Sequence, residues 1–182
     1  MSADNVAMKT IFKMMDLLPD GKITRENFER YAKHERDVVK LLNSDEAEKV
    51  YSGLISISDM LGLDKYAKDG GMSYTVREMD IARRIVARTG DLSEANQVLH
   101  SAYFRAIDTN GDQLLEKSEW TNYLKIRKTY TSEEQAMQSF DSLDKNKDGV
   151  ISLPEFVEHS VDFWCNLGEE YGAQDMYGTK DL

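Results

Sequence analysis

The chain has 182 residues and carries 33 acidic against 23 basic side chains, which gives a formal net charge of -10. This length suffices for one domain with an apolar core, and the acidic balance disfavours nucleic acid and anionic membranes while favouring cations or basic partners. The single cysteine, Cys165, excludes an internal disulfide and is typical of a reducing compartment.

The sequence carries no targeting, membrane or catalytic pattern. Its first ten residues, MSADNVAMKT, lack the charged-then-apolar order of a secretory signal, and no run of about 18 apolar residues could span a membrane. No nucleophile–base set, glycine-rich phosphate loop or CxxC pattern appears, so we expect no enzyme. We expect a soluble, cytoplasmic monomer with no nucleic acid, membrane or obligate protein partner.

Loops rich in oxygen donors alternate with segments of helical period. Phe104 and Ile107 precede the loop 108–119, and Trp120 and Leu124 follow it at steps of three and four, which mark one face of a helix. The same spacing surrounds the other loops. The sequence therefore predicts an all-α chain of eight helices, in four helix–loop–helix units arranged as two pairs.

Two loops show most clearly what such a unit could hold: Asp108–Glu119 reads DTNGDQLLEKSE and Asp144–Glu155 reads DKNKDGVISLPE. A calcium ion takes six to eight oxygen ligands, and positions one, three, five, seven, nine and twelve of a coiled twelve-residue loop supply them. Position six, where the chain bends sharply, favours glycine, and position eight is an apolar residue that points into the core.

The first loop in chain order, Asp16–Asn27 (DLLPDGKITREN), keeps this frame but loses part of the chemistry. Leu18 offers no oxygen at position three, and Asn27 replaces the closing glutamate, which removes a charge and one of two oxygens. We predict an empty loop kept for packing. The alternative is a weak site that uses Asp16, Asp20, Thr24 and Asn27.

The second loop is fainter still. If Glu78 closes it, positions one and five are Ala67 and Gly71, which supply no side-chain oxygen. Gly90 and Asp91 then mark a break between a helix that ends near Arg88 and one that begins near Ser93. We therefore divide the chain into an N-terminal pair with degenerate loops (1–90), a C-terminal calcium-binding pair (91–166) and a tail packed on the core (167–182).

The third loop fills every ligand position. Its ligands are Asp108, Asn110, Asp112, the Leu114 carbonyl, Glu116 and Glu119. Gln113 stands where glycine is expected, and a left-handed conformation there would cost about 1–2 kcal/mol. A register shifted by two would put Ala106 first and Lys117 last and would destroy the ligand set, so we expect a working but softer site.

The fourth loop fills the ligand positions and has Gly149 at the bend. Its ligands are Asp144, Asn146, Asp148, the Val150 carbonyl, Ser152 through its hydroxyl or a water, and Glu155. The helix that leads into it should begin at the capping-box sequence TSEE, which starts at Thr131, and run to about Leu143. We expect Leu115 and Ile151, each at position eight of its loop, to pair across a short β-bridge.

Three passages carry a family resemblance: FRAIDTNGD (104–112), SFDSLDKNKDGVISLPEFV (139–157) and VDFWCNLGEEYGAQDMYG (161–178). The chain resembles the EF-hand superfamily and, within it, the invertebrate sarcoplasmic calcium-binding proteins. That resemblance implies a compact, mostly helical, intracellular buffer for Ca²⁺ with Mg²⁺ in competition, holding ions in hands one, three and four. Because the first hand departs from the pattern at Leu18 and Asn27, we do not extend its ion to this chain and expect two calcium sites.

Two further functions stay open beside the buffer. A sensor would open a methionine-rich groove for a target helix, but most of the methionines lie in the N-terminal half, and Trp164, Tyr171 and Tyr177 could fill such a groove from within. The chain also resembles coelenterazine-binding proteins and calcium-regulated photoproteins. Photoproteins have histidines near the positions of Met8 and Ser160, which argues against a photoprotein, whereas a luciferin carrier needs no motif that a sequence would show.

Overall fold

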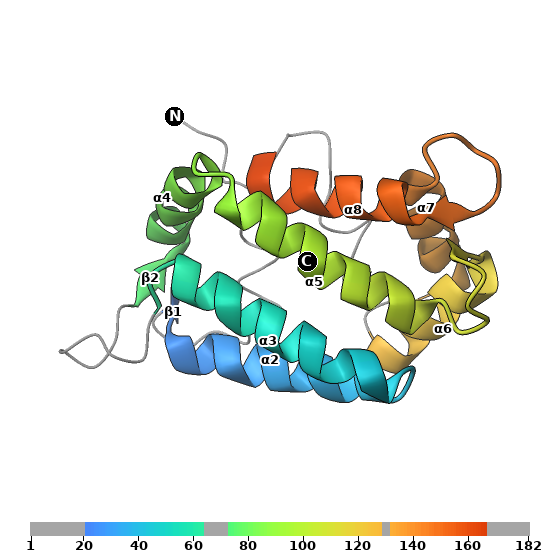
Figure 1. Cartoon of the computed structure of the whole chain (residues 1–182), viewed down its shortest axis with the longest axis horizontal. Helices are drawn as coiled ribbons and strands as arrows, with labels where there is room; N and C mark the ends of the chain where they lie inside the picture. The colour runs from blue at the N-terminus through green and yellow to red at the C-terminus, as the bar shows by residue number, and fades with distance from the viewer. Residues whose placement is uncertain (1–20, 64–72, 129–131, 167–182) are drawn as a thin grey trace.

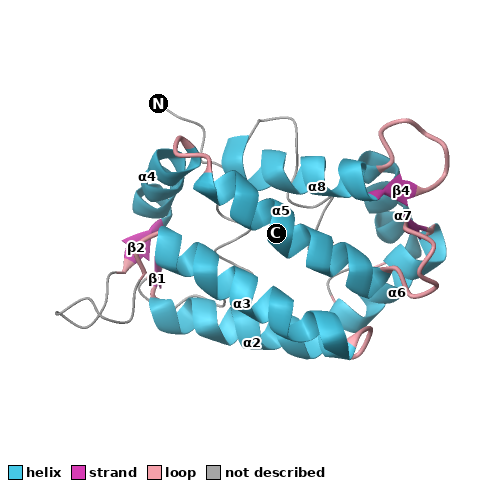
Figure 2. Cartoon of the chain, viewed as in Figure 1, coloured by secondary structure: helices cyan, strands magenta, loops and turns pink. Residues whose placement is uncertain are grey.

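The computed structural model describes residues 21–63, 73–128 and 132–166, and these residues are mostly helical (Figure 2). Within them, seven α-helices are followed by one π-helix. Their bounds are α2 (Arg25–Lys40), α3 (Ser44–Met60), α4 (Val76–Ala87), α5 (Asp91–Ile107), α6 (Lys117–Arg127), α7 (Glu133–Leu143), α8 (Leu153–Val161) and η1 (Asp162–Asn166). The all-α prediction is confirmed; the predicted helix ahead of Asp16 lies outside the described residues.

Two predicted helix starts need correction. α7 begins at Glu133, because Ser132 is its N-cap and accepts a hydrogen bond from the Gln135 N–H; Thr131 lies outside the described residues. α5 begins at Asp91. Gly90, directly before it, is its N-cap and has a left-handed φ of 85°. Local capping geometry therefore shifted each start by about two residues from the expected position.

The helices form a continuous chain of packed neighbours (Figure 1). α2 lies beside α3, α3 packs on α5, and α5 packs on α8, so that α5 crosses the middle of the molecule. α3 and α5 approach closely at Gly53, where an added Cβ would lie 3.0 Å from Leu99 Cδ1. This contact joins the N-terminal and C-terminal halves, and a side chain at position 53 would force Leu99 to shift.

Two short antiparallel strand pairs join the loops in twos. β3 (Leu114–Leu115) pairs with β4 (Ile151–Ser152), and Leu115 lies opposite Ile151, which confirms the predicted bridge. β1 (Lys22–Ile23) pairs with β2 (Tyr74–Thr75) in the same register, so that each position-eight residue of the first two loops faces the other. The N-terminal loops therefore keep the pairing of the C-terminal loops.

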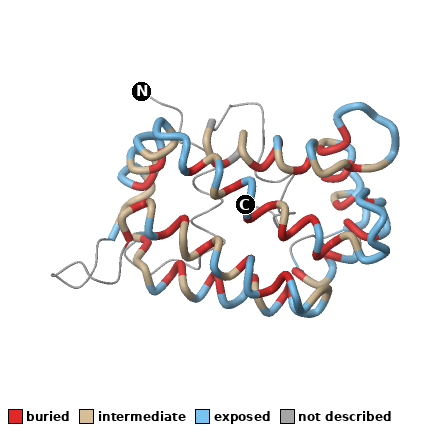
Figure 3. The backbone as a smooth tube through the Cα atoms, viewed as in Figure 1, coloured by how far each residue is buried: buried red, intermediate tan, exposed pale blue. Residues whose placement is uncertain are grey.

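Buried apolar residues from both halves form one core (Figure 3). At its centre Trp120 meets Phe156 edge-on, with ring centroids 6.1 Å apart, and the Trp120 indole N–H donates to Ser139 Oγ at 3.0 Å. Trp164 of η1 is also buried, whereas Tyr171 and Tyr177, predicted to fill the groove, lie outside the described residues. None of the described helices is long and apolar enough to cross a membrane.

Candidate calcium sites

All four loops end in the same backbone cap. The side chain at position twelve accepts the backbone N–H of position nine, over 2.8 to 3.1 Å, and so fixes the first turn of the helix that leaves the loop. The pairs are Thr24 with Asn27, Thr75 with Glu78, Glu116 with Glu119 and Ser152 with Glu155. A glutamate at position twelve has a second oxygen left after making this cap, and an asparagine has none.

In the fourth loop the carboxylates hold the backbone in a tight coil. Asp144 Oδ2 accepts the Gly149 N–H at 2.9 Å, and Asp148 Oδ1 accepts the Val150 N–H at 3.1 Å. Asn146 Oδ1 accepts the Asp148 N–H at 2.8 Å. These bonds fold positions one to seven of the loop into one compact coil, whose ligand spacing is the one that a cation site uses.

The third loop repeats these three bonds. Asp108 Oδ2 accepts the Gln113 N–H at 2.9 Å, and Asn110 Oδ1 accepts the Asp112 N–H at 2.9 Å. Asp112 Oδ1 in turn accepts the Leu114 N–H, also at 2.9 Å. Two stretches with different sequences therefore fold into one pattern of side-chain to backbone hydrogen bonds, set by the acidic and amide residues they share.

Each of the two loops has two left-handed residues, at positions four and six. In the third loop these are Gly111 (φ 75°) and Gln113 (φ 69°); in the fourth they are Lys147 (φ 60°) and Gly149 (φ 89°). The left-handed conformation considered for Gln113 is confirmed, and the matching conformation of Lys147 was not predicted. Each loop places glycine at one of the two positions and a strained residue at the other.

The closing glutamates reach across their loops. Glu119 Oε1 accepts the Thr109 and Asn110 N–H groups at 2.8 and 3.2 Å, and Glu155 Oε1 accepts the Asn146 N–H at 3.4 Å. Burial would raise the pKa of Glu155, but the hydrogen bonds donated by Ser152 and Asn146 hold it below its ordinary value. The carboxylate is therefore charged at neutral pH, as a cation ligand must be.

The donor chemistry of both loops fits calcium. Each loop offers hard oxygens alone, in the number and spacing that this ion takes, with carboxylates at positions one, five and twelve. Across the described residues no three His, Cys, Asp or Glu side chains already converge on one point. The carboxylates of both loops bond to backbone N–H groups of their own loop. When bound, the cation would supply the charge that draws them together.

Comparison with known proteins agrees with this geometry. A family model for an EF-hand domain pair matches residues 96–160, which contain both loops. Residues 96–160 therefore form an EF-hand domain pair. Residues 13–66 match a second model, described as a family of unknown function (DUF6865).

The chain as a whole is similar to luciferin-binding and coelenterazine-binding proteins. Luciferin-binding protein of Renilla reniformis is 29% identical over 172 residues, which are 94% of this chain and 91% of that protein. The calcium-loaded apo form of coelenterazine-binding protein from Renilla muelleri has a TM-score of 0.56 at 26% identity, over 99% of this chain and 100% of that one. Calcium-loaded apo-aequorin from Aequorea victoria has a TM-score of 0.69 at 17% identity, over 87% and 88% of the two chains, which shows a common fold. The likeness to the sarcoplasmic branch stays a prediction.

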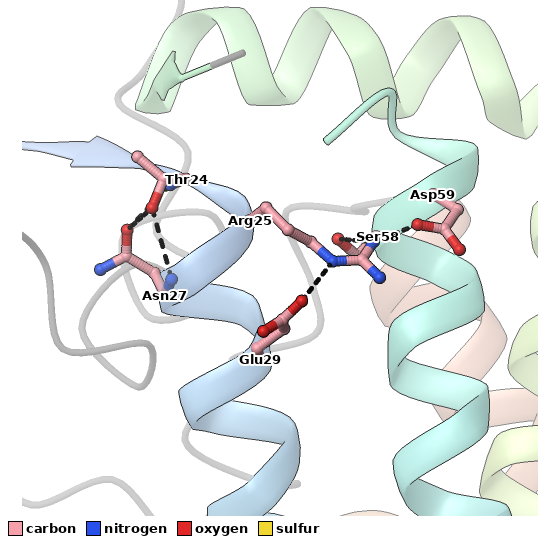
Figure 4. Close-up of polar contacts among 6 residues, drawn as sticks. All are labelled: Thr24, Arg25, Asn27, Glu29, Ser58 and Asp59. Carbon is pink, nitrogen blue, oxygen red and sulfur yellow. Dashed lines mark hydrogen bonds and ion pairs between the residues drawn. The ribbon is translucent and has the colours of Figure 1, made fainter. Parts of the chain in front are cut away.

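The described residues at the end of the first loop are engaged in hydrogen bonds and an ion pair (Figure 4). Asn27 Oδ1 accepts from both the N–H and the hydroxyl of Thr24, at 2.8 and 2.6 Å, so its single oxygen is used by the cap. Next to it, Arg25 donates to Glu29 at 3.1 Å and to Ser58 at 3.1 Å, and pairs with Asp59 of α3. Because Asp16, Leu18 and Asp20 lie outside the described residues, the prediction of an empty loop stays a prediction.

Two buried arginines, Arg83 and Arg127, form contacts between the N-terminal and C-terminal halves. They were not identified from the sequence. Arg83 of α4 donates to the backbone carbonyls of Trp164 and Cys165, both at 2.9 Å, and so caps the end of η1. Arg127 of α6 pairs with Glu35 of α2 at 2.8 Å, and both side chains are at most 2% exposed. The sequence feature that could have identified these arginines is a charged residue on the apolar face of an amphipathic helix.

Proposed function

We propose that this protein binds two calcium ions, one in each of the loops 108–119 and 144–155, and that it acts as a calcium buffer. The observation that carries the proposal is the pairing of two equivalent oxygen-donor loops through β3 and β4. An ion that tightens one loop also fixes the strand that the other loop needs, so the two sites should bind cooperatively. Magnesium would compete at the same oxygens, because both ions are hard cations.

The charges of the ligands support this proposal. The third loop contributes four ligand carboxylates (Asp108, Asp112, Glu116 and Glu119) and the fourth contributes three (Asp144, Asp148 and Glu155). Two bound calcium ions bring four positive charges against these seven negative ones, so occupancy relieves repulsion in a chain whose net charge is already -10. A ligand that binds only the folded state also stabilises it. Cytoplasmic placement belongs to the same proposal and is supported by the single cysteine.

Isothermal titration of the full chain with calcium tests the proposal. We expect two strong binding events in the wild-type protein and one in Glu119→Gln, with the exposed Glu94→Gln on α5 as a control that keeps both. A wild-type chain that shows no calcium binding would overturn the proposal, and a third event of equal strength would overturn the prediction for Asp16–Asn27.

A second candidate function is carriage of a coelenterazine-type luciferin. It is favoured by the two Renilla relatives, which match nearly the whole chain and are named for luciferin or coelenterazine binding. Mixing the calcium-free protein with coelenterazine and separating bound from free ligand by gel filtration would test it. A 1:1 complex that calcium dissociates supports the carrier, whereas a protein that binds calcium and retains no coelenterazine is a buffer.

A further inference from the structure

One buried carboxylate, that of Glu35, bonds to two different helices. Its Oε1 accepts from Arg127 Nη2 at 2.8 Å and from Nε at 3.1 Å, and its Oε2 accepts the hydroxyl of Tyr103 at 2.8 Å. Tyr31, one turn earlier on α2, accepts from the same Arg127 nitrogen at 3.1 Å. Burial would lower the pKa of Arg127, but Glu35 outweighs it and the pKa lies above its ordinary value. Arg127 is therefore charged.

The two helices that Glu35 joins are those of the third EF-hand. Tyr103 lies on α5, which leads into the loop 108–119, and Arg127 is the last residue of α6, which leads out of it. Tyr103 and Tyr123 also meet across this helix pair, with ring centroids 6.5 Å apart. The carboxylate of α2 thus sits at the end of α6 distant from the loop, where any change of the interhelical angle is largest.

We propose that Glu35 acts as a clamp on the third EF-hand: it holds α5 and α6 at one angle and keeps the hand closed when calcium binds. In EF-hand sensors calcium swings the outgoing helix away from the incoming one and exposes an apolar groove. Here such a swing would carry Arg127 away from Tyr103, and one carboxylate could no longer reach both. The clamp rests on the proposed function, because it acts on a hand that binds calcium.

The clamp comes from the half of the molecule whose loops have lost ligands. α2 is the outgoing helix of the first EF-hand, and its own position-twelve residue is Asn27. Separating the partners of a buried ion pair is costly, because it leaves uncompensated charge in the core, where water does not replace the lost bonds. The N-terminal half therefore controls how far the C-terminal half can open.

The test uses variants that remove the clamp without leaving a buried charge. Glu35→Leu/Arg127→Met replaces the pair by apolar side chains of similar size, an exchange that proteins often tolerate. Tyr103→Phe removes only the bond to α5 and keeps the ion pair. Asp37→Asn, at an exposed acid on the same helix, is the control for removing an α2 carboxylate outside the clamp. Each full-length variant is titrated with calcium and, separately, its calcium-dependent binding of a hydrophobic dye is measured.

We expect calcium to leave dye fluorescence unchanged in the wild type and in Asp37→Asn, and to raise it in Glu35→Leu/Arg127→Met, with a smaller rise in Tyr103→Phe. Removal of the clamp should also tighten calcium binding by about fivefold or more, the usual range of coupling between sites. Normal calcium binding with a flat dye signal in the double variant overturns the clamp alone, as does a wild type that already opens. Loss of calcium binding in the wild type itself overturns the proposed function, and the clamp with it.

Discussion

The two pairs of loops differ in chemistry far more than in architecture. β1–β2 and β3–β4 share one register, and the position-nine to position-twelve cap is present in all four loops. The N-terminal pair lacks ligand oxygens at positions three and twelve of its first loop and at positions one and five of its second. The frame of an EF-hand therefore depends on backbone pairing and caps, and it survives the loss of its ligands.

The largest effect is expected from replacing the residue at position twelve of the fourth loop. Glu155→Asn gives the fourth loop the position-twelve residue of the first. It keeps the cap through one oxygen and loses both the charge and the oxygen that reaches Asn146. We expect calcium affinity at that site to fall about 100-fold, with the helical content unchanged, as measured by titration and circular dichroism. A near-normal affinity would mean that the cap, and not the second oxygen, makes the site.

Acid should act on the C-terminal half, because the two buried histidines lie there. Burial lowers the pKa of His100 and of His159 from 6.5 to about 4. Between these values the unfolded chain takes up the proton and the folded chain does not, so stability is full above about pH 6.5 and is lost as the pH falls toward 4. At pH 5 the loss is about 2 kcal/mol for each histidine.

Thermal unfolding of the calcium-free protein at several pH values measures this loss. His100→Phe should flatten the acid slope, whereas His34→Gln, at an exposed position of α2, should leave it unchanged. Equal slopes in the wild type and in His100→Phe would show that His100 contributes nothing to the acid response.

Restoring ligands to the first loop sharpens the comparison from the other side. Leu18→Asp/Asn27→Glu returns oxygens to positions three and twelve of a loop whose strand and cap are already in place. We expect a third calcium event in titration, at least about tenfold tighter than any residual binding there. Leu18→Asn/Asn27→Gln adds one oxygen, at position three, without adding charge and is the matched control. If no third event appears, the first loop lacks more than the two restored ligands.

The smallest effect concerns backbone strain. Gln113→Gly should stabilise the protein by about 0.5–1 kcal/mol, because relief of the left-handed strain exceeds the added flexibility of the unfolded chain. Gly149→Gln should destabilise it by a similar amount, since the same position then carries the same strain. Denaturant unfolding measures both, and the Gln113→Gly result would contradict the strain argument if stability fell.

The sequence predicted what is local and missed what is distant. Ligand spacing, the Leu115–Ile151 bridge and the strained Gln113 all follow from residues within one loop, whose chemistry can be read directly. The start of α7 was misplaced because Ser132 and Thr131 are both good caps, and sequence alone does not rank them. The Glu35–Arg127 pair joins residues far apart in the chain, so no local pattern identifies the partner. The ligand assignments themselves stay predictions, supported by the loop geometry.

The cap that Arg83 provides limits how the molecule can be divided. Two carbonyls at the end of η1, those of Trp164 and Cys165, receive their donors from α4 on the far side of the Gly90 break. A fragment that starts at Asp91 would keep both calcium loops and still lack these donors. Through these two bonds the N-terminal half contributes to the stability of the half that carries both predicted calcium loops.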